Sequence, residues 1–166
     1  MKALFIGRFQ PFHLGHLLLL QRLSDQYAMI IIGIGSSQYH DTLDNPFSEE
    51  ERHQMIILSL NDVGIRQYRI ISIPDIHDPP NWVNHVCSIV SDFDVVIANN
   101  PFTKQLFSEK GYTVKGTQYF NRKQYSGKEI RRRIIHDEPW ADFVPRIVYK
   151  FIHDIDGINR LKQLSQ

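Results

Sequence analysis

Two histidines three positions apart are the most chemically suggestive feature near the start of the chain. His13 and His16 lie within residues 7–16, GRFQPFHLGH, which also contain Arg8 and two glycines. A planar guanidinium suits phosphate oxygens, and glycines let the backbone approach a ligand closely. The histidines fall where a helix should begin, and free N–H groups at a helix start favour an anion. With no obvious nucleophile present, the pattern indicates a site that handles phosphate.

A second phosphate-binding pattern lies late in the chain, at Ser126, Gly127 and Lys128. A serine N-cap and a glycine leave backbone N–H groups exposed at a helix start. Arg131 follows on the first or second turn and can point back toward the same anion. Glu129 has the spacing of a capping box with Ser126. Lys128 opposes the helix dipole unless an anion is bound. The alternative is a solvated basic helix face.

Two other interpretations of the histidines stay open at this point. They can be ordinary residues in a turn rich in glycine and proline. Two histidines three apart can also share a zinc ion, although Cys87 is distant in the chain and no local carboxylate completes a set of ligands.

The segments around these residues alternate between strand and helix patterns, which predicts an α/β fold. We expect a Rossmann-like open, mainly parallel sheet, with helices on both faces and a helical C-terminal tail. The expected strands are residues 2–7, 27–34, 67–73, 93–98 and 112–115. Helices are expected at 14–26, from a Ser48 capping box to about 61, through Val83 to Val90, and from an Asn100 cap to about 110. Such a sheet binds ligands beyond the carboxyl ends of its strands, where residues 7–16 would lie.

Bulk composition excludes several classes of protein. The chain has 166 residues, a formal net charge of +1 and one cysteine, Cys87. We therefore expect one domain over residues 1–166, with no nucleic acid or membrane partner attracted by bulk charge. A single cysteine excludes a disulfide framework within the chain and is consistent with the reducing cytoplasm. The residues before the first motif are too few for a signal peptide, and no apolar run is long enough to cross a bilayer.

The two motifs together resemble those of a known enzyme superfamily. GRFQPFHLGH resembles the HxGH signature of the nucleotidylyltransferases, in the form found in archaeal-type nicotinamide mononucleotide (NMN) adenylyltransferases. Ser126, Gly127, Ile130, Arg131 and Arg132 resemble the second signature, SGTxIRR, with Lys128 in place of threonine. Shorter matches extend the resemblance over nearly the whole chain, among them GSSQ at residues 35–38, NPF at 45–47 followed by Glu51-Arg52, and NP at 100–101.

The resemblance implies an enzyme that transfers AMP from ATP to NMN, giving NAD and pyrophosphate. Its catalytic residues would be His13, His16, Arg8 and Arg131. ATP would be bound by Gly7, Arg8, Phe9, His13, Gly15, His16, Arg122, Ser126, Gly127, Lys128 and Arg131. NMN would be bound by Ser37, Asp75, Ile76 and Trp82. Mg²⁺ would be held by ATP oxygens and water with no protein ligand, and the family tends to form homohexamers.

Some of these residues have a physical rationale of their own. A nicotinamide ring in NMN is cationic, and tryptophan is the best aromatic face for a cation, so Trp82 can bind it or simply fill the core. Asp75 can meet ribose hydroxyls or a carboxamide, or cap its own loop. Cys87 is expected to be a small buried residue. Other acceptors, phosphopantetheine or the substrate of a cytidylyltransferase, stay open, as does a regulatory module that binds nucleotide without turnover.

Overall fold

The structure is a computed structural model that describes residues 1–117 and 125–166. Its centre is a sheet of parallel strands in the order β3-β2-β1-β4-β5. The strands are β1 (Lys2–Gly7), β2 (Met29–Gly35), β3 (Tyr68–Ile73), β4 (Val95–Ile97) and β5 (Val114–Lys115). This order confirms the expected open parallel sheet and puts a topological switch point between β1 and β4.

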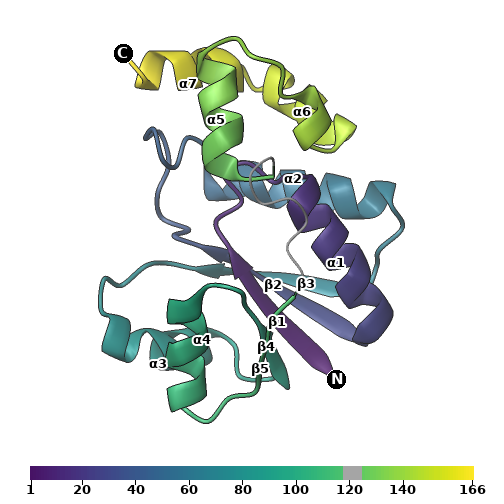
Figure 1. The fold of residues 1–166 in the computed structure, drawn as a ribbon, viewed down its shortest axis with the longest axis vertical. Helices are drawn as coiled ribbons and strands as arrows, with labels where there is room; N and C mark the ends of the chain where they lie inside the picture. The colour runs from purple at the N-terminus through teal and green to yellow at the C-terminus, as the bar shows by residue number, and fades with distance from the viewer. Residues whose placement is uncertain (118–124) are drawn as a thin grey trace.

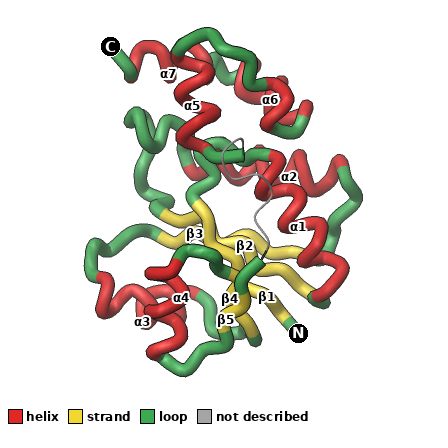
Figure 2. Tube along the Cα trace, viewed as in Figure 1, coloured by secondary structure: helices red, strands yellow, loops and turns green. Residues whose placement is uncertain are grey.

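Helices cover both faces of the sheet, as Figures 1 and 2 show. One face carries α1 (Leu14–Gln26) and α2 (Glu49–Asp62), and the other carries α3 (Pro79–Ile89) and α4 (Pro101–Glu109). The C-terminal tail holds α5 (Gly127–Ile135), the short 3₁₀ helix η1 (Ala141–Phe143), α6 (Arg146–Asp154) and α7 (Gly157–Leu164). In the tail α6 packs on α2 and α5 packs on α7, which confirms the expected helical tail.

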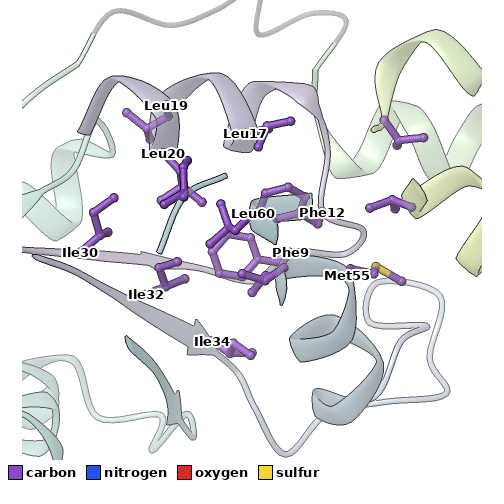
Figure 3. Packing of buried hydrophobic residues seen from close by; sticks show 14 of the residues in the cluster. Phe9, Phe12, Leu17, Leu19, Leu20, Ile30, Ile32, Ile34, Met55 and Leu60 are labelled. Carbon is purple, nitrogen blue, oxygen red and sulfur yellow. The ribbon is translucent and has the colours of Figure 1, made fainter. Parts of the chain in front are cut away.

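Strict alternation along the central strands explains the two layers of helices. In β1, Ala3 and Phe5 face α1 and α2, whereas Leu4 and Ile6 face α3 and α4. Successive side chains of a strand point to opposite faces, and a strand buried on both faces is apolar throughout. Figure 3 shows the first layer, where Phe9 and Phe12 lie among side chains from α1, β2 and α2. The loop that leaves β1 is therefore anchored in the core.

The helix starts confirm most of the expected caps. Ser48 and Glu51 form the predicted capping box of α2, and Asn100 accepts hydrogen bonds from the Phe102 and Thr103 amides at the start of α4. Pro145 lies directly before α6 and Gly111 follows α4 with a φ of 83°, as their residue types predict.

Three expectations were wrong in detail. Ser126 accepts a hydrogen bond from the Glu129 amide, but Glu129 does not complete the capping box, because its carboxylate pairs with Arg132 and Arg133. The fourth and fifth strands are shorter than predicted, because only residues 95–97 pair with β1 and only residues 114–115 pair with β4. Cys87 is half-buried and its thiol lies 3.1 Å from the Tyr112 hydroxyl, so it is not the small core residue expected.

No helix among the described residues combines the length and apolarity that crossing a membrane requires.

Candidate active site

A cavity of about 340 Å³ opens at the switch point between β1 and β4. Parallel α/β sheets bind ligands at this place, because neighbouring loops leave in opposite directions there. The cavity is lined by residues from both expected phosphate-binding motifs, among them His13, Gly15, His16, Ser126 and Gly127. The fold thus brings together two segments separated by more than a hundred residues.

The two histidines hold each other in place through the backbone. The His16 amide donates to Nδ1 of His13 at 3.4 Å, and the His13 amide donates to Nδ1 of His16 at 3.2 Å. This is a reciprocal capping box at the start of α1, built from histidines in place of serine and glutamate. The rings stack with their centroids 3.6 Å apart. Both side chains are fixed before any ligand binds.

This geometry sets the position of the proton on each ring. A neutral imidazole has one protonated nitrogen, and a nitrogen that accepts a hydrogen bond is the other one. Since Nδ1 accepts in both rings, the proton of the neutral form lies on Nε2 of both His13 and His16. The pair therefore offers two Nε2–H donors away from the backbone, which suits an anionic oxygen.

Burial keeps both rings neutral in the free protein. It lowers the pKa of His13 to about 3. Burial, with a smaller contribution from His13, also lowers the pKa of His16 well below its usual value. Neutral donors at this point cost less to bury than two imidazolium ions would.

The late motif meets the early one at the main-chain carbonyl of Gln10. Arg131 donates to this oxygen from Nη1 at 2.7 Å, and a Cβ on Gly127 would lie only 2.8 Å from it. A Cβ on Gly15 would in turn lie 2.9 Å from Cβ of Tyr125. A side chain at Gly127 would collide with main chain and one at Gly15 with side chains, so both glycines let the two segments approach closely, which sequence reasoning described only as close approach to a ligand.

Gln10 and Arg52 hold the loops around the site together, and the sequence analysis did not predict this role. The Gln10 side chain is buried and pairs with both backbone groups of Phe47, at 2.9 and 3.0 Å. Arg52 is fully buried and donates to main-chain carbonyls of the loops after β1 and β2, those of Arg8, Gly35, Ser36, Ser37 and Tyr39. Burial lowers the pKa of Arg52 to about 10, so the guanidinium stays charged at neutral pH. The only sequence signal for Arg52 was its match to a family pattern.

The site is cationic before it binds a ligand. Arg131 is only 6% exposed, and its pKa is lowered first by burial and then by the positive charge of Arg8. Asp44, whose side chain is 81% exposed, lies 3.6 Å from Arg131 and offsets only part of this charge. A polyphosphate would relieve the repulsion between Arg8 and Arg131.

A second cavity, of about 810 Å³, lies on the other side of the end of β1. It shares Ile6, Asn100 and Thr103 with the first cavity, so the two adjoin. Gly7, Arg8, Asp75 and Trp82 line it, together with Asp78 and His77. One site therefore has room for two ligands that meet above the first strand.

The loops around the second cavity are held in an unusual backbone conformation. Phe9, Ser36 and His77 follow β1, β2 and β3 with φ angles of 54°, 47° and 51°. A residue other than glycine costs roughly 1–2 kcal/mol there. The Phe9 ring is buried below His16, with centroids 4.7 Å apart, and Arg52 binds the Ser36 carbonyl. Packing and hydrogen bonds thus offset the cost of the sharp turns that shape the site.

The residues expected to bind NMN divide into two groups. Asp75 and Trp82 line the second cavity, whereas Ser37 and Ile76 do not. Ser37 is buried, and its amide and carbonyl bond to Ile73 and Arg52. Asp75 also caps its own loop, because its Oδ1 accepts from the His77 amide at 2.9 Å.

The remaining residues expected to bind ATP differ in their surroundings. Lys128 is exposed at the start of α5, and the Phe9 side chain lies in the core. Arg122 lies outside the described residues. Asn99 and Thr117, which bond to each other, also line the first cavity and were not predicted.

A parallel sheet with helices on both faces and a cavity at its switch point is a Rossmann-like fold, and solved structures share it. A bifunctional NMN adenylyltransferase/ADP ribose pyrophosphatase from Francisella tularensis, complexed with AMP and a manganese ion, matches 98% of the chain with a TM-score of 0.78 and 23% identity. The chain spans 52% of that longer protein. The nicotinic acid mononucleotide adenylyltransferase of Plasmodium falciparum matches 95% of the chain, and 96% of its own, with a TM-score of 0.65 and 9% identity.

Sequence comparison gives the family. The cytidylyltransferase-like family model matches residues 4–133. Nicotinamide-nucleotide adenylyltransferases of Picrophilus torridus and Methanococcus aeolicus are 44% and 47% identical, over 100% and 99% of this chain and 98% and 95% of theirs. The chain belongs to this nicotinamide-nucleotide adenylyltransferase family of the HxGH superfamily, as its two motifs predicted.

The first prediction concerns pH and the histidine pair. Between pH 6.5 and about 3 the unfolded chain binds protons at His13 and His16 that the folded chain does not, so stability should fall with acid. Each histidine changes the free energy of unfolding by at most about 1.4 kcal/mol per pH unit. Urea unfolding at a series of pH values from 6.5 to 5 should show that the free energy of unfolding falls less steeply with acid in the H13N/H16N variant than in wild type. H136N, a variant of an exposed histidine, is the control. The same pH dependence of the free energy of unfolding in wild type and H13N/H16N, or an equally reduced one in H136N, would contradict this account.

The second prediction concerns the contact between the motifs. In Gly127→Ala the new methyl group would lie against the Gln10 carbonyl, so α5 must move away from the early motif. We expect ATP affinity, measured by calorimetry, to fall at least about tenfold, since small displacements of a binding group are costly. Gly111→Ala is the control, because Gly111 also disfavours a side chain but has open space around it. Unchanged ATP affinity in G127A would show that the contact does not matter.

Proposed function

We propose that the chain transfers AMP from ATP to NMN, giving NAD and pyrophosphate. The observation that carries this proposal is the pair of adjoining cavities at the end of β1. One is lined by parts of both phosphate-binding motifs, and the other by Trp82, Arg8 and two carboxylates. A group-transfer enzyme needs two such substrate sites with the reacting phosphates between them. The relatives of this chain carry the same activity in their names.

ATP would occupy the first cavity. The N–H groups at the start of α5 and the guanidinium of Arg131 would hold the β- and γ-phosphates, which leave as pyrophosphate. The Nε2–H groups of His13 and His16 would face the α-phosphate. Arg8, which lines the second cavity, would contact the same phosphate from that side. Asn99 and Thr117 line the same cavity as the histidines and would contact the nucleoside.

NMN would occupy the second cavity. Its pyridinium ring is cationic, and Trp82 offers an aromatic face for it, while Asp75 and Asp78 add negative charge to the same lining. Trp82 is held edge-on against Phe107 with ring centroids 5.6 Å apart, so its orientation is set by α4. The NMN phosphate would then lie near Arg8 at the junction of the cavities.

The reaction needs no base from the protein. An oxygen of the NMN phosphate attacks the α-phosphorus of ATP, a new P–O bond forms, and the bond to the β-phosphate oxygen breaks. Because a phosphate anion is already a nucleophile, the protein contributes position and charge stabilisation. The histidine donors are fixed by the backbone before ATP arrives, so little reorganisation is required as charge grows on the α-phosphate.

Mg²⁺ would enter as part of the ATP substrate. The described residues contain no group of three or more His, Cys, Asp or Glu side chains arranged to hold a metal ion, and ATP oxygens and water can supply its ligands. The ion would neutralise phosphate charge. We also propose that residues 1–166 act as one cytoplasmic domain, that Lys128 meets the pyrophosphate in place of a threonine, and that the chain forms a closed homo-oligomer such as a hexamer.

The third prediction tests the substrate. Radiolabelled ATP should yield labelled NAD and free pyrophosphate with NMN, and no adduct with phosphopantetheine or glycerol phosphate. The acceptor that turns over fastest decides among members of the superfamily. Absence of pyrophosphate release with every acceptor would instead favour a regulatory nucleotide-binding protein.

The fourth prediction tests the aromatic face. Trp82→Leu should raise KM for NMN about tenfold, because a cation on an aromatic ring is worth about 1 kcal/mol or more when partly desolvated. KM for ATP should stay within about twofold. Trp82→Phe retains an aromatic face and should lose less. Equal losses for both substrates in W82L would indicate a packing role only.

A further inference from the structure

Arg160, on the C-terminal helix α7, makes a two-pronged contact with the start of α2. It donates to both carboxylate oxygens of Glu51, at 2.7 and 2.8 Å, and to the main-chain carbonyl of Pro46 at 3.1 Å. Side-chain exposures of 26% for Arg160 and 18% for Glu51 make this a partly buried pair. Paired hydrogen bonds between guanidinium and carboxylate are strong and fix direction as well as distance.

Glu51 connects Arg160 to residues 46–48, the segment that binds Gln10. Its carboxylate also accepts from the Ser48 amide at 2.9 Å. Burial acts to raise the pKa of Glu51, but the hydrogen bonds from Arg160 and Ser48 outweigh it and lower the pKa, so the carboxylate is charged. Pro46 and Ser48, the residues on either side of Phe47, are thus both tied to the Arg160–Glu51 pair. The start of α7 also lies against the Phe47 ring, since a Cβ on Gly157 would be 3.1 Å from it.

Phe47 in turn determines where Gln10 lies. Its amide and carbonyl pair with the Gln10 side chain, and the Gln10 carbonyl accepts from Arg131 at 2.7 Å. Every step from Arg160 to Arg131 is therefore a hydrogen bond or a covalent neighbour. Neither Arg160 nor Glu51 lines the two cavities.

We propose that Arg160 is a positioning residue for adenylyl transfer, acting through Glu51 and the Phe47–Gln10 pair to fix Arg131 against the early motif. This inference rests on the proposed function. Without Arg160, Pro46 loses its donor and the Glu51 carboxylate loses its fixed orientation, so residues 46–48 gain freedom. Gln10 and Arg131 would then sample wrong positions, which lowers the rate while leaving the NMN cavity intact.

The test compares Arg160→Met with Lys162→Met, the matched control. Lys162 is on the same helix and also pairs with an acidic residue, but its partner Asp137 follows α5 and lies outside residues 46–51, through which Arg160 acts. In protein shown to be folded by circular dichroism, R160M should lower kcat about tenfold and weaken ATP binding in calorimetry, with KM for NMN within twofold. K162M should match wild type in all three. Glu51→Gln combined with R160M should be no worse than R160M alone, because both act along one path.

A role in stability alone would lower the melting temperature of R160M and leave kcat and ATP affinity of the folded protein within threefold of wild type, which would overturn the proposal. If R160M does not fold, Arg160→Lys replaces it, since lysine keeps the charge and loses the two-pronged contact. Values of kcat and ATP affinity within threefold of wild type in R160K would likewise overturn the proposal. Wild-type protein that binds ATP but makes no NAD would refute the proposed function instead. The ATP affinity of R160M would then still report on positioning.

Discussion

The main-chain carbonyl of Gln10 is the point on which the rest of the site depends. It accepts the buried Arg131 guanidinium, and Gly127 leaves space for it where any side chain would collide. A charged donor on a buried carbonyl makes a stronger hydrogen bond than a neutral one. Through this contact two helix starts, those of α1 and α5, face one cavity. Each helix start alone is a weak anion site, and residues of both line the same cavity.

Charge in the empty site is arranged for a ligand that carries the opposite sign. The charge of Arg8 adds to burial in lowering the pKa of Arg131, and the nearby carboxylate of Asp44 is mostly in solvent. The histidines avoid adding to this repulsion because burial keeps them neutral. Arg52 is buried like Arg131, but main-chain carbonyls surround it. Its role is to bind the loops together, so the ligand meets a site that is already formed.

Sequence alone predicted the sheet, the helices and the two motifs, because apolar alternation and helix caps are local signals. It also indicated that His13, Gly15, Ser126 and Gly127 belong to one site. It could not show that Gly127 meets a main-chain carbonyl, or that the histidines cap each other. Those facts depend on contacts between segments far apart in the chain.

The errors have physical causes of the same kind. Glu129 had the spacing of a capping box, yet two arginines one turn later are stronger partners than a backbone amide. Gln10 and Arg52 carried no pattern beyond a family match, since their partners are main-chain groups that any sequence provides. Ser37 fitted a family loop, but its side chain lies outside both cavities and its backbone is used for structure.

The most direct test of this account is a crystal structure with a non-hydrolysable ATP analogue and NMN. The account predicts one triphosphate in contact with Nε2 of His13 or His16 and, at its other end, with Arg131 and the amides at the start of α5. A triphosphate that touches only one of the two motifs, with Gln10 no longer between Arg131 and Gly127, would contradict it.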